Sequence, residues 1–221
     1  MRVEMDEHGM ISHARVRHAR STRIERGRRT AAITGIVVHQ TDADTSASSL
    51  NSYRQPGANG AHFLIDKDGT IYQTAAIYQR TNHVGPLKAR CLVIPTCKMS
   101  DFPPRVGPAE MHRIEMLKAP ADRYPSNMEA IGIEMVGKAT LPVGLKLVGE
   151  EAKWSMGRLR GERAIFETPT AAQNQALSWL VGAIVDSMHM SPNEVFRHPV
   201  VRSKNPTEAK GANWNLLPLA P

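Results

Sequence analysis

Two short apolar segments, 32–38 and 130–137, restrict the fold more than any other feature of the sequence. The first is rich in β-branched residues, which predicts a buried strand, and the second is a further candidate for one. His39 directly follows the first segment, and Glu134 lies towards the end of the second. A polar side chain at the end of a buried strand is a natural place to look for a functional group.

A β-hairpin is predicted between these two strands. Segments 62–66 and 70–73 flank the pair Asp68-Gly69, and an Asp-Gly pair suits the positive φ angles of a tight turn. The preceding segment 42–53 is small and polar, and we expect it to hold a short helix.

The clearest helix is predicted to begin at Thr168-Pro169, where Thr168 suits the N-cap and Pro169 the first helical position. It should end before Ser191-Pro192. Its apolar residues recur at helical spacing, so one face is expected in the core. These residues are Leu177, Leu180, Val181, Ile184, Val185 and Met188.

The length of 221 residues fits one sizeable domain with extensions better than two full domains. Because strands are mixed with helices, we predict a single α/β domain at residues 31–221, preceded by a basic arm at residues 1–30. Segments 84–127 and 138–167 are expected to be long insertions over the core, the second of them a hairpin or flap.

The charge of the chain is basic and uneven, with 28 Lys and Arg against 21 Asp and Glu. Residues 1–30 hold eight arginines and four acidic residues, which fits either an anion-binding surface or a solvated tail. They contain no aromatic residue for base stacking, so nucleic acid is not the expected partner. The longest apolar stretch is too short to span a bilayer, so membrane insertion is not expected either.

The N-terminus lacks the apolar segment of a secretory signal, so we expect synthesis in the cytoplasm. Cys91 and Cys97 are the only cysteines, and they have no zinc-finger spacing. Two free thiols are the expectation, and a disulfide formed after export is the alternative.

Three residues suggest a metal site. His39 follows a predicted strand, His198 lies in a loop after the long helix, and Glu208 follows His198 by ten positions. Two imidazoles and a carboxylate suit catalytic Zn²⁺, which takes three protein ligands and leaves a fourth position for water. Each residue alone is weak evidence, because histidine has many roles.

Several motifs in this order resemble the zinc N-acetylmuramoyl-L-alanine amidases (Amidase_2), a family that includes phage lysozyme-like amidases and peptidoglycan recognition proteins. The resemblance covers roughly residues 30–214, where 168–214 is similar to the closing helix and second ligand loop. The motifs lie at 36–41, 61–65 with 68–73, 82–85 and 131–137.

The resemblance implies a mixed central sheet flanked by helices, with Zn²⁺ in an open groove. By position, His39 and His198 match the first two ligands. The third ligand in the family is usually Asp or Cys, often in Asp-Pro-Gly, and the best match here is Glu208. Pro206 occupies the alternative spacing and has no ligating side chain.

The resemblance also implies roles for other residues. Glu134 matches the strand carboxylate that acts as general base, although a surface Glu at a strand edge is the alternative. Lys204 is expected to stabilise the oxyanion, with Lys210 as a competitor for that role. We expect His62 and His83 to lie at the substrate site, and packing is the alternative role of His62.

The implied reaction is hydrolysis of the amide bond between the muramic acid lactyl group and the L-alanine of peptidoglycan or muropeptides. The alternative is a recognition module that binds the wall without cleaving it. The action is expected at the cell wall, by a recycling enzyme, a phage lysin or a secreted effector. Segments 123–127 and 205–209 look similar to type VI amidase effectors, which implies an immunity protein as a further possible partner.

Overall fold

A six-stranded mixed β-sheet forms the centre of the protein in a computed structural model that describes residues 2–29 and 31–215. The four strands at one side of the sheet are mutually parallel, the fifth is antiparallel to the fourth, and the sixth runs parallel to the fifth. In spatial order the strands are β12 (Val195–Arg197), β5 (Gly35–Gln40), β9 (Ala130–Met135), β6 (Phe63–Ile65), β7 (Ile71–Gln73) and β3 (Val16–His18). This arrangement confirms the predicted α/β fold with a mixed sheet.

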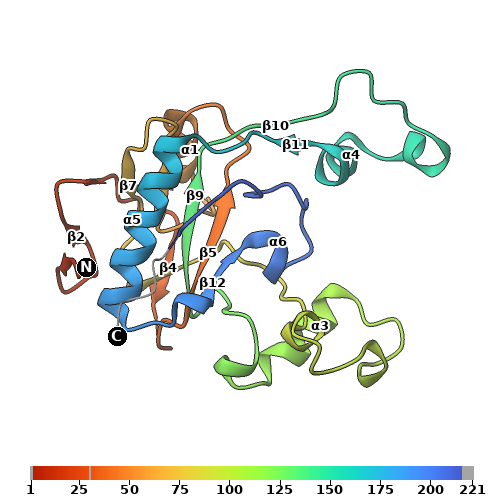
Figure 1. The fold of residues 1–221 in the computed structure, drawn as a ribbon, viewed down its shortest axis with the longest axis horizontal. Helices are drawn as coiled ribbons and strands as arrows, with labels where there is room; N and C mark the ends of the chain where they lie inside the picture. Colours follow the sequence, from red (N-terminus) through yellow and green to blue (C-terminus); the bar gives the residue numbers. More distant parts are fainter. Residues whose placement is uncertain (1, 30, 216–221) are drawn as a thin grey trace.

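The two faces of the sheet are covered differently, because side chains alternate along a strand. In β5, Ile36 and Val38 pack into the main core, whereas Val37 packs into a second apolar cluster on the opposite face. The main core is closed by α5 (Ala171–Met188), which lies along the sheet in Figure 1. The opposite face is left for α6 (His198–Val201) and the loops around it.

The start of α5 differs from the prediction by two residues. Thr170, and not Thr168, is the N-cap, and its Oγ1 accepts a hydrogen bond of 3.0 Å from the backbone N–H of Gln173. The Gln173 side chain accepts in turn from the N–H of Thr170, which completes a capping box. This reciprocal pair outweighs the preference of Pro169 for the first helical position.

The predicted hairpin is confirmed. β6 and β7 pair antiparallel, with Phe63 opposite Gln73, and Gly69 has a φ of 86° in the connecting turn. The expected short helix after β5 is α1 (Ser46–Tyr53).

Residues 1–30 differ from the expected basic arm. Met1 and Thr30 lie outside the described residues, but β3 forms one edge of the central sheet, and Ile11 and Ile24 are fully buried. The apolar residues between the arginines anchor this segment, since their burial outweighs a basic composition that alone suggests a tail. The other strands here are β1 (Glu4–Met5) with β2 (Ile11–Ser12), and β4 (Glu25–Arg28) with β8 (Gln79–Thr81).

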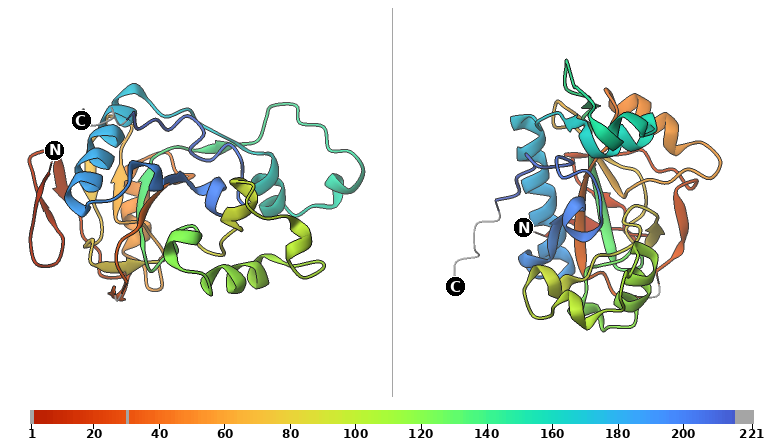
Figure 2. Two further views of the ribbon diagram at one scale, coloured as in Figure 1. Left: turned by 60° about the horizontal axis from the view of Figure 1, so that its bottom comes forward. Right: turned by 90° about the vertical axis from the view of Figure 1, so that its right-hand side faces the viewer.

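Two lobes project beside α6, at residues 138–167 and 84–127, the segments expected to be insertions (Figure 1). Residues 138–167 form the β10 (Ala139–Thr140) and β11 (Ile165–Phe166) ladder and α4 (Met156–Arg163), which matches the expected hairpin or flap. Residues 84–127 contain α2 (Arg90–Val93) and α3 (Pro108–Met116). Figure 2 shows the two lobes apart from each other and away from α5. Short 3-10 turns lie at Met99–Asp101, Pro120–Asp122, Gly149–Lys153 and Pro192–Glu194.

None of the helices within residues 2–29 and 31–215 has the length and apolar character needed to cross a bilayer.

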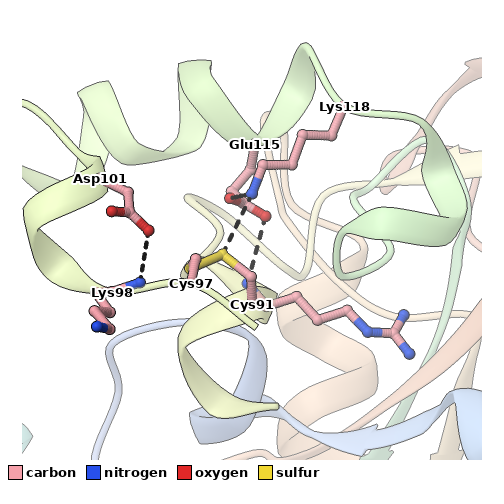
Figure 3. The surroundings of a disulfide bond; sticks show 7 residues. Cys91, Cys97, Lys98, Asp101, Glu115 and Lys118 are labelled. Carbon is pink, nitrogen blue, oxygen red and sulfur yellow. Dashed lines mark hydrogen bonds and ion pairs between the residues drawn. A yellow bond between two sulfur atoms is a disulfide. The ribbon is translucent and has the colours of Figure 1, made fainter. Parts of the chain in front are cut away.

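The expectation of two free thiols is wrong. Cys91 and Cys97 form a disulfide between α2 and the turn that follows it (Figure 3). The buried carboxylate of Glu115 lies beside it and accepts hydrogen bonds from the Lys118 ammonium and the backbone N–H of Arg90. Spacing alone did not reveal the pair, because the turn after α2 brings the two Cα atoms to 5.3 Å.

Replacing both cysteines (Cys91→Ser with Cys97→Ser) should lower the free energy of unfolding by roughly 2 kcal/mol, the entropy of closing so short a loop. Urea denaturation of the oxidised protein and the double variant measures the difference. Thiol titration in denaturant without reductant should find no free thiol, and two thiols per chain would contradict the disulfide.

Candidate metal centre

The register of the parallel strands places three functional side chains at one edge of the sheet. His39 in β5 lies directly opposite Glu134 in β9. On the other side of β5, Arg197 of β12 pairs with Val38, so that His198 follows next to His39. His39 has the same side-chain direction as Val37, away from α5, and therefore faces the side of α6 and the lobes.

Glu208 completes a compact group with the two histidines. One Glu208 oxygen, Oε1, lies 2.8 Å from His198 Nδ1 and 3.6 Å from His39 Nδ1. The two imidazole rings are 4.2 Å apart between centroids, and one ligand atom from each of the three residues lies within 4.8 Å of the others. All three side chains are buried. The three predicted ligands are thus brought together.

The charge states of this group suit a cation. Burial, together with His198, lowers the pKa of His39 to about 4, so this imidazole is neutral at pH 7 and has a free lone pair. Burial alone would raise the pKa of Glu208, but hydrogen bonds to His198 and His39 outweigh it and hold that pKa well below its ordinary range. A buried carboxylate and a neutral imidazole are donors that Zn²⁺ prefers.

The hydrogen bonds of His198 supply an independent test of the fit. Its Nε2 lies 3.0 Å from the carbonyl oxygen of Val84, and its Nδ1 lies 2.8 Å from Glu208 Oε1. Both neighbours are acceptors, whereas a neutral imidazole has only one N–H to donate. When the imidazole is neutral and its proton is on Nε2, the Nδ1 lone pair and the carboxylate converge on one point, and a cation there would satisfy both. The residues present therefore fit a zinc ion.

Glu208 reaches this position because its loop is held on both sides. Asn205 Nδ2 donates to the carbonyl of Ala164 at 2.7 Å, which links the loop to the α4 lobe. The next residue, Ala209, has a φ of 54° and donates its N–H to Gln40 Oε1. These contacts hold the turn so that the Glu208 carboxylate meets the two imidazoles.

Glu134 is poised beside the three-residue group without a partner of its own. Its Oε2 is buried and has no hydrogen-bond partner among the described residues. Burial raises the pKa of Glu134 to about 8, and the negative charge of Glu208 adds to the shift, whereas Lys204 opposes it. A surface position at a strand edge is therefore excluded, and a proton acceptor with a pKa near neutrality is what general-base catalysis needs.

The candidate cations differ in position. Lys204 is exposed, lines the groove that contains Glu134 and the three donors, and its charge influences both Glu134 and His39. Lys210 does not line the groove. The geometry favours Lys204 over its competitor.

The two histidines expected at the substrate site have different surroundings. His83 lines the groove, and its Nδ1 lies 2.9 Å from His39 Nε2. His62 is fully buried and does not line the groove. Its Nδ1 accepts from the N–H of Gly132, and its Nε2 lies 2.9 Å from the carbonyl oxygen of Gln79 and 2.7 Å from Arg29 Nη2. A direct substrate contact for His62 does not fit this position, and the packing alternative does.

The groove has a volume of about 1320 Å³ and runs from the α1 region to the α4 lobe. Sequence reasoning missed several residues of its wall, because they lie in the two insertions or in loops, where no motif marks them. Arg202 follows His198 by four residues, and its proximity to that ligand was the one available signal. The missed wall residues are Lys88, Asn127, Arg158, Arg160, Phe166 and Arg202.

Comparison with known families agrees with this geometry. The sequence profile of the N-acetylmuramoyl-L-alanine amidases matches residues 29–211. The chain belongs to this family. The match includes His39, His198 and Glu208, and it begins before β5 and ends after the Glu208 turn. Family membership supports a peptidoglycan amidase.

Solved structures show similarity of fold at low sequence identity. A selenomethionine derivative of AmpD is 16% identical with a TM-score of 0.51, and the match covers 92% of this chain and 93% of that one. AmpDH3 from Pseudomonas aeruginosa, in complex with anhydromuramic pentapeptide, is 20% identical over 76% of this chain and 51% of that one, with a TM-score of 0.45.

The Drosophila peptidoglycan recognition protein SA is 13% identical over 90% of this chain and 88% of that one, with a TM-score of 0.47. Among curated proteins, no sequence matches this chain significantly.

The raised pKa of Glu134 predicts a pH-dependent cost to stability. Because the pKa rises on folding, the folded state favours the protonated carboxyl of Glu134. The stability of the protein is therefore unaffected by this group below about pH 4.5, where it is protonated in both states, and decreases as the pH rises from there towards 8. Glu134→Gln removes this ionisation. In the presence of chelator, it should raise the free energy of unfolding by roughly 2–4 kcal/mol at pH 8 and by much less at pH 5. Urea denaturation at both values checks this, and an equal effect at the two would contradict it.

Proposed function

We propose that this protein is a zinc-dependent N-acetylmuramoyl-L-alanine amidase, which cleaves the amide between the lactyl group of muramic acid and the L-alanine of the stem peptide. Membership of the family supports the reaction class. The observation that carries the proposal is the buried group of His39, His198 and Glu208 with the unpartnered Glu134 beside it.

The residues divide the chemistry between them. Zn²⁺ held by His39, His198 and Glu208 would supply a Lewis acid that polarises the amide carbonyl and acidifies water. Glu134 accepts the proton of the attacking water as the new C–O bond forms. Glu134 then delivers this proton to the leaving nitrogen of L-alanine as the C–N bond breaks. Its raised pKa suits both halves of this transfer.

Lys204 is the cation of the groove wall that suits the developing negative charge on the carbonyl oxygen. The ammonium group is free of carboxylate partners among the ion pairs of the described residues, and its field reaches Glu134. A positive charge held near the oxyanion stabilises the tetrahedral state more than the planar amide.

We further propose that the enzyme acts on the cell wall, outside the cytoplasm. The Cys91–Cys97 disulfide supports this setting, because disulfides persist in oxidising compartments and are rare in the cytosol. The substrates are peptidoglycan or muropeptides, the class of ligand named for the AmpDH3 complex. A recognition module without activity is the weaker reading, since all three donors and the general base converge.

Two variants should separate metal binding from turnover. His39→Ala removes a ligand, so both the zinc content and the release of L-alanyl peptides should be lost. Glu134→Gln keeps the three donors, so the zinc content should stay near one per chain while turnover falls about 10²–10⁴-fold. Elemental analysis and a chromatographic assay on a muramyl peptide measure these quantities. Full activity of Glu134→Gln would remove Glu134 from the mechanism.

The role of Lys204 is tested by Lys204→Met, which removes the charge and keeps most of the side-chain length. The value of kcat should fall about 10–100-fold, while zinc affinity stays unchanged because Lys204 is not a donor. Lys210→Met is the matched control and should leave kcat as it is. Equal losses in the two variants would point to the overall basic charge of the chain instead.

A further inference from the structure

The consecutive residues His83 and Val84 contact the Nε2 atoms of the two proposed imidazole ligands. His83 Nδ1 lies 2.9 Å from His39 Nε2, and the carbonyl oxygen of Val84 lies 3.0 Å from His198 Nε2. In each ligand the opposite nitrogen, Nδ1, is the one that faces Glu208. A single short segment therefore contacts the two ligands from behind, on the side away from the donor group.

The direction of these hydrogen bonds can be assigned from the neighbouring groups. His83 Nε2 lies 3.4 Å from the carbonyl oxygen of Ala130, which can only accept, so His83 carries its proton on Nε2. Its Nδ1 is then an acceptor, and His39 Nε2 must donate to it. The carbonyl of Val84 likewise requires a proton on His198 Nε2. Both ligands are thereby fixed in the tautomer that leaves the Nδ1 lone pair free.

One side chain holds this segment in place. Asn127 Oδ1 accepts a hydrogen bond of 2.9 Å from the N–H of His83 and one of 2.8 Å from the N–H of Val84. Arg29, which is largely buried, anchors the same region, since Nη1 donates to the carbonyl of Met128 and Nη2 to that of Ala130. The Asn127 amide thus links the α3 insertion directly to the two residues, His83 and Val84, that accept hydrogen bonds from the ligands.

Gly132 in β9 leaves room for this contact. A Cβ atom on Gly132 would lie 2.7 Å from His83 Nδ1, so any larger residue would displace the imidazole. The absence of a side chain at 132 allows His83 to lie against the strand, between the positions of Ala130 and Glu134.

We propose that the His83–Val84 segment, held by Asn127, orients both imidazole ligands and selects the tautomer that binds the metal. His83 and Asn127 are then positioning residues, which act through His39 and His198. This inference rests on the proposed zinc site. Groups that orient metal ligands in this way typically contribute 10–100-fold in metal affinity.

The experiment measures the affinity of the full chain for Zn²⁺ alone, by competition with a chromophoric chelator. His83→Asn places an amide oxygen where Nδ1 lies, whereas His83→Gln places it where Nε2 lies, at the far side of the ring. We expect His83→Gln to weaken zinc binding about 10–100-fold. His83→Asn should retain the affinity within about 3-fold, because its amide oxygen still accepts the proton of His39 Nε2. Equal affinities of the two variants and the wild type would overturn the proposal.

Asn127 is tested in the same way. Asn127→Ala removes the acceptor of both N–H groups and should weaken zinc binding about 10-fold or more. Asn127→Asp places a carboxylate oxygen where the amide oxygen accepts the two N–H groups, and it should keep most of the affinity. The visible spectrum of the Co²⁺-substituted protein should change in Asn127→Ala and His83→Gln alone, because it reports the geometry of the ligands.

His112→Ala is the matched control. Its Nδ1 accepts the backbone N–H of Leu87 in the same insertion but contacts neither ligand. An effect of His112→Ala on zinc affinity as large as that of His83→Gln would overturn the proposal, because it would show a general loosening of the insertion. A wild-type chain that binds no Zn²⁺ would instead refute the proposed zinc site itself, so the two failures are distinguishable.

Discussion

The parallel pairing of β12, β5 and β9 determines where every proposed catalytic group lies. Because the carboxyl ends of parallel strands meet at one edge of the sheet, His198, His39 and Glu134 become neighbours although they are far apart in sequence. A shift of one residue in the β5–β9 register would turn His39 or Glu134 to the α5 face. The continuous apolar packing of α5 against Ile36, Val38 and Ile133 prevents that shift.

The same arrangement has a cost in stability. The fold buries three ionisable groups of the donor set and raises the pKa of Glu134, so the site is a place where charge is disfavoured in the absence of a cation. Glu208 is the group that makes this tolerable, since its carboxylate lies 2.8 Å from Nδ1 of His198 and 3.6 Å from Nδ1 of His39. The groups proposed for catalysis therefore lower the stability of the folded protein, and a bound metal would restore part of it.

Much of the centre of the fold could be predicted from local patterns. β5, β9, the β6–β7 hairpin and the core face of α5 follow from apolar periodicity and turn residues. The three donors also met as expected. Long-range contacts could not be predicted from these local patterns. The apolar residues among the arginines of 1–30 pack against the edge of the sheet, and His62 is enclosed by β9 and β8 instead of facing substrate.

The insertions were the least predictable part of the chain. Neither the Cys91–Cys97 pairing nor the contacts of Asn127 with His83 and Val84 leave a pattern in the sequence, since they depend on loops that fold back onto the sheet. The acceptor for His198 is a backbone carbonyl, which has no side-chain signature at all. Orientation of the ligands thus became visible only in three dimensions.

The position of the cleaved bond tests the account most directly. Purified peptidoglycan is digested with zinc-loaded and chelator-treated protein, and the products are analysed by mass spectrometry. The account predicts free stem peptides that begin with L-alanine, together with glycan strands that carry unsubstituted lactyl groups, in the zinc-loaded sample alone. Intact muropeptides in both samples, or cleavage at any other bond, would contradict it.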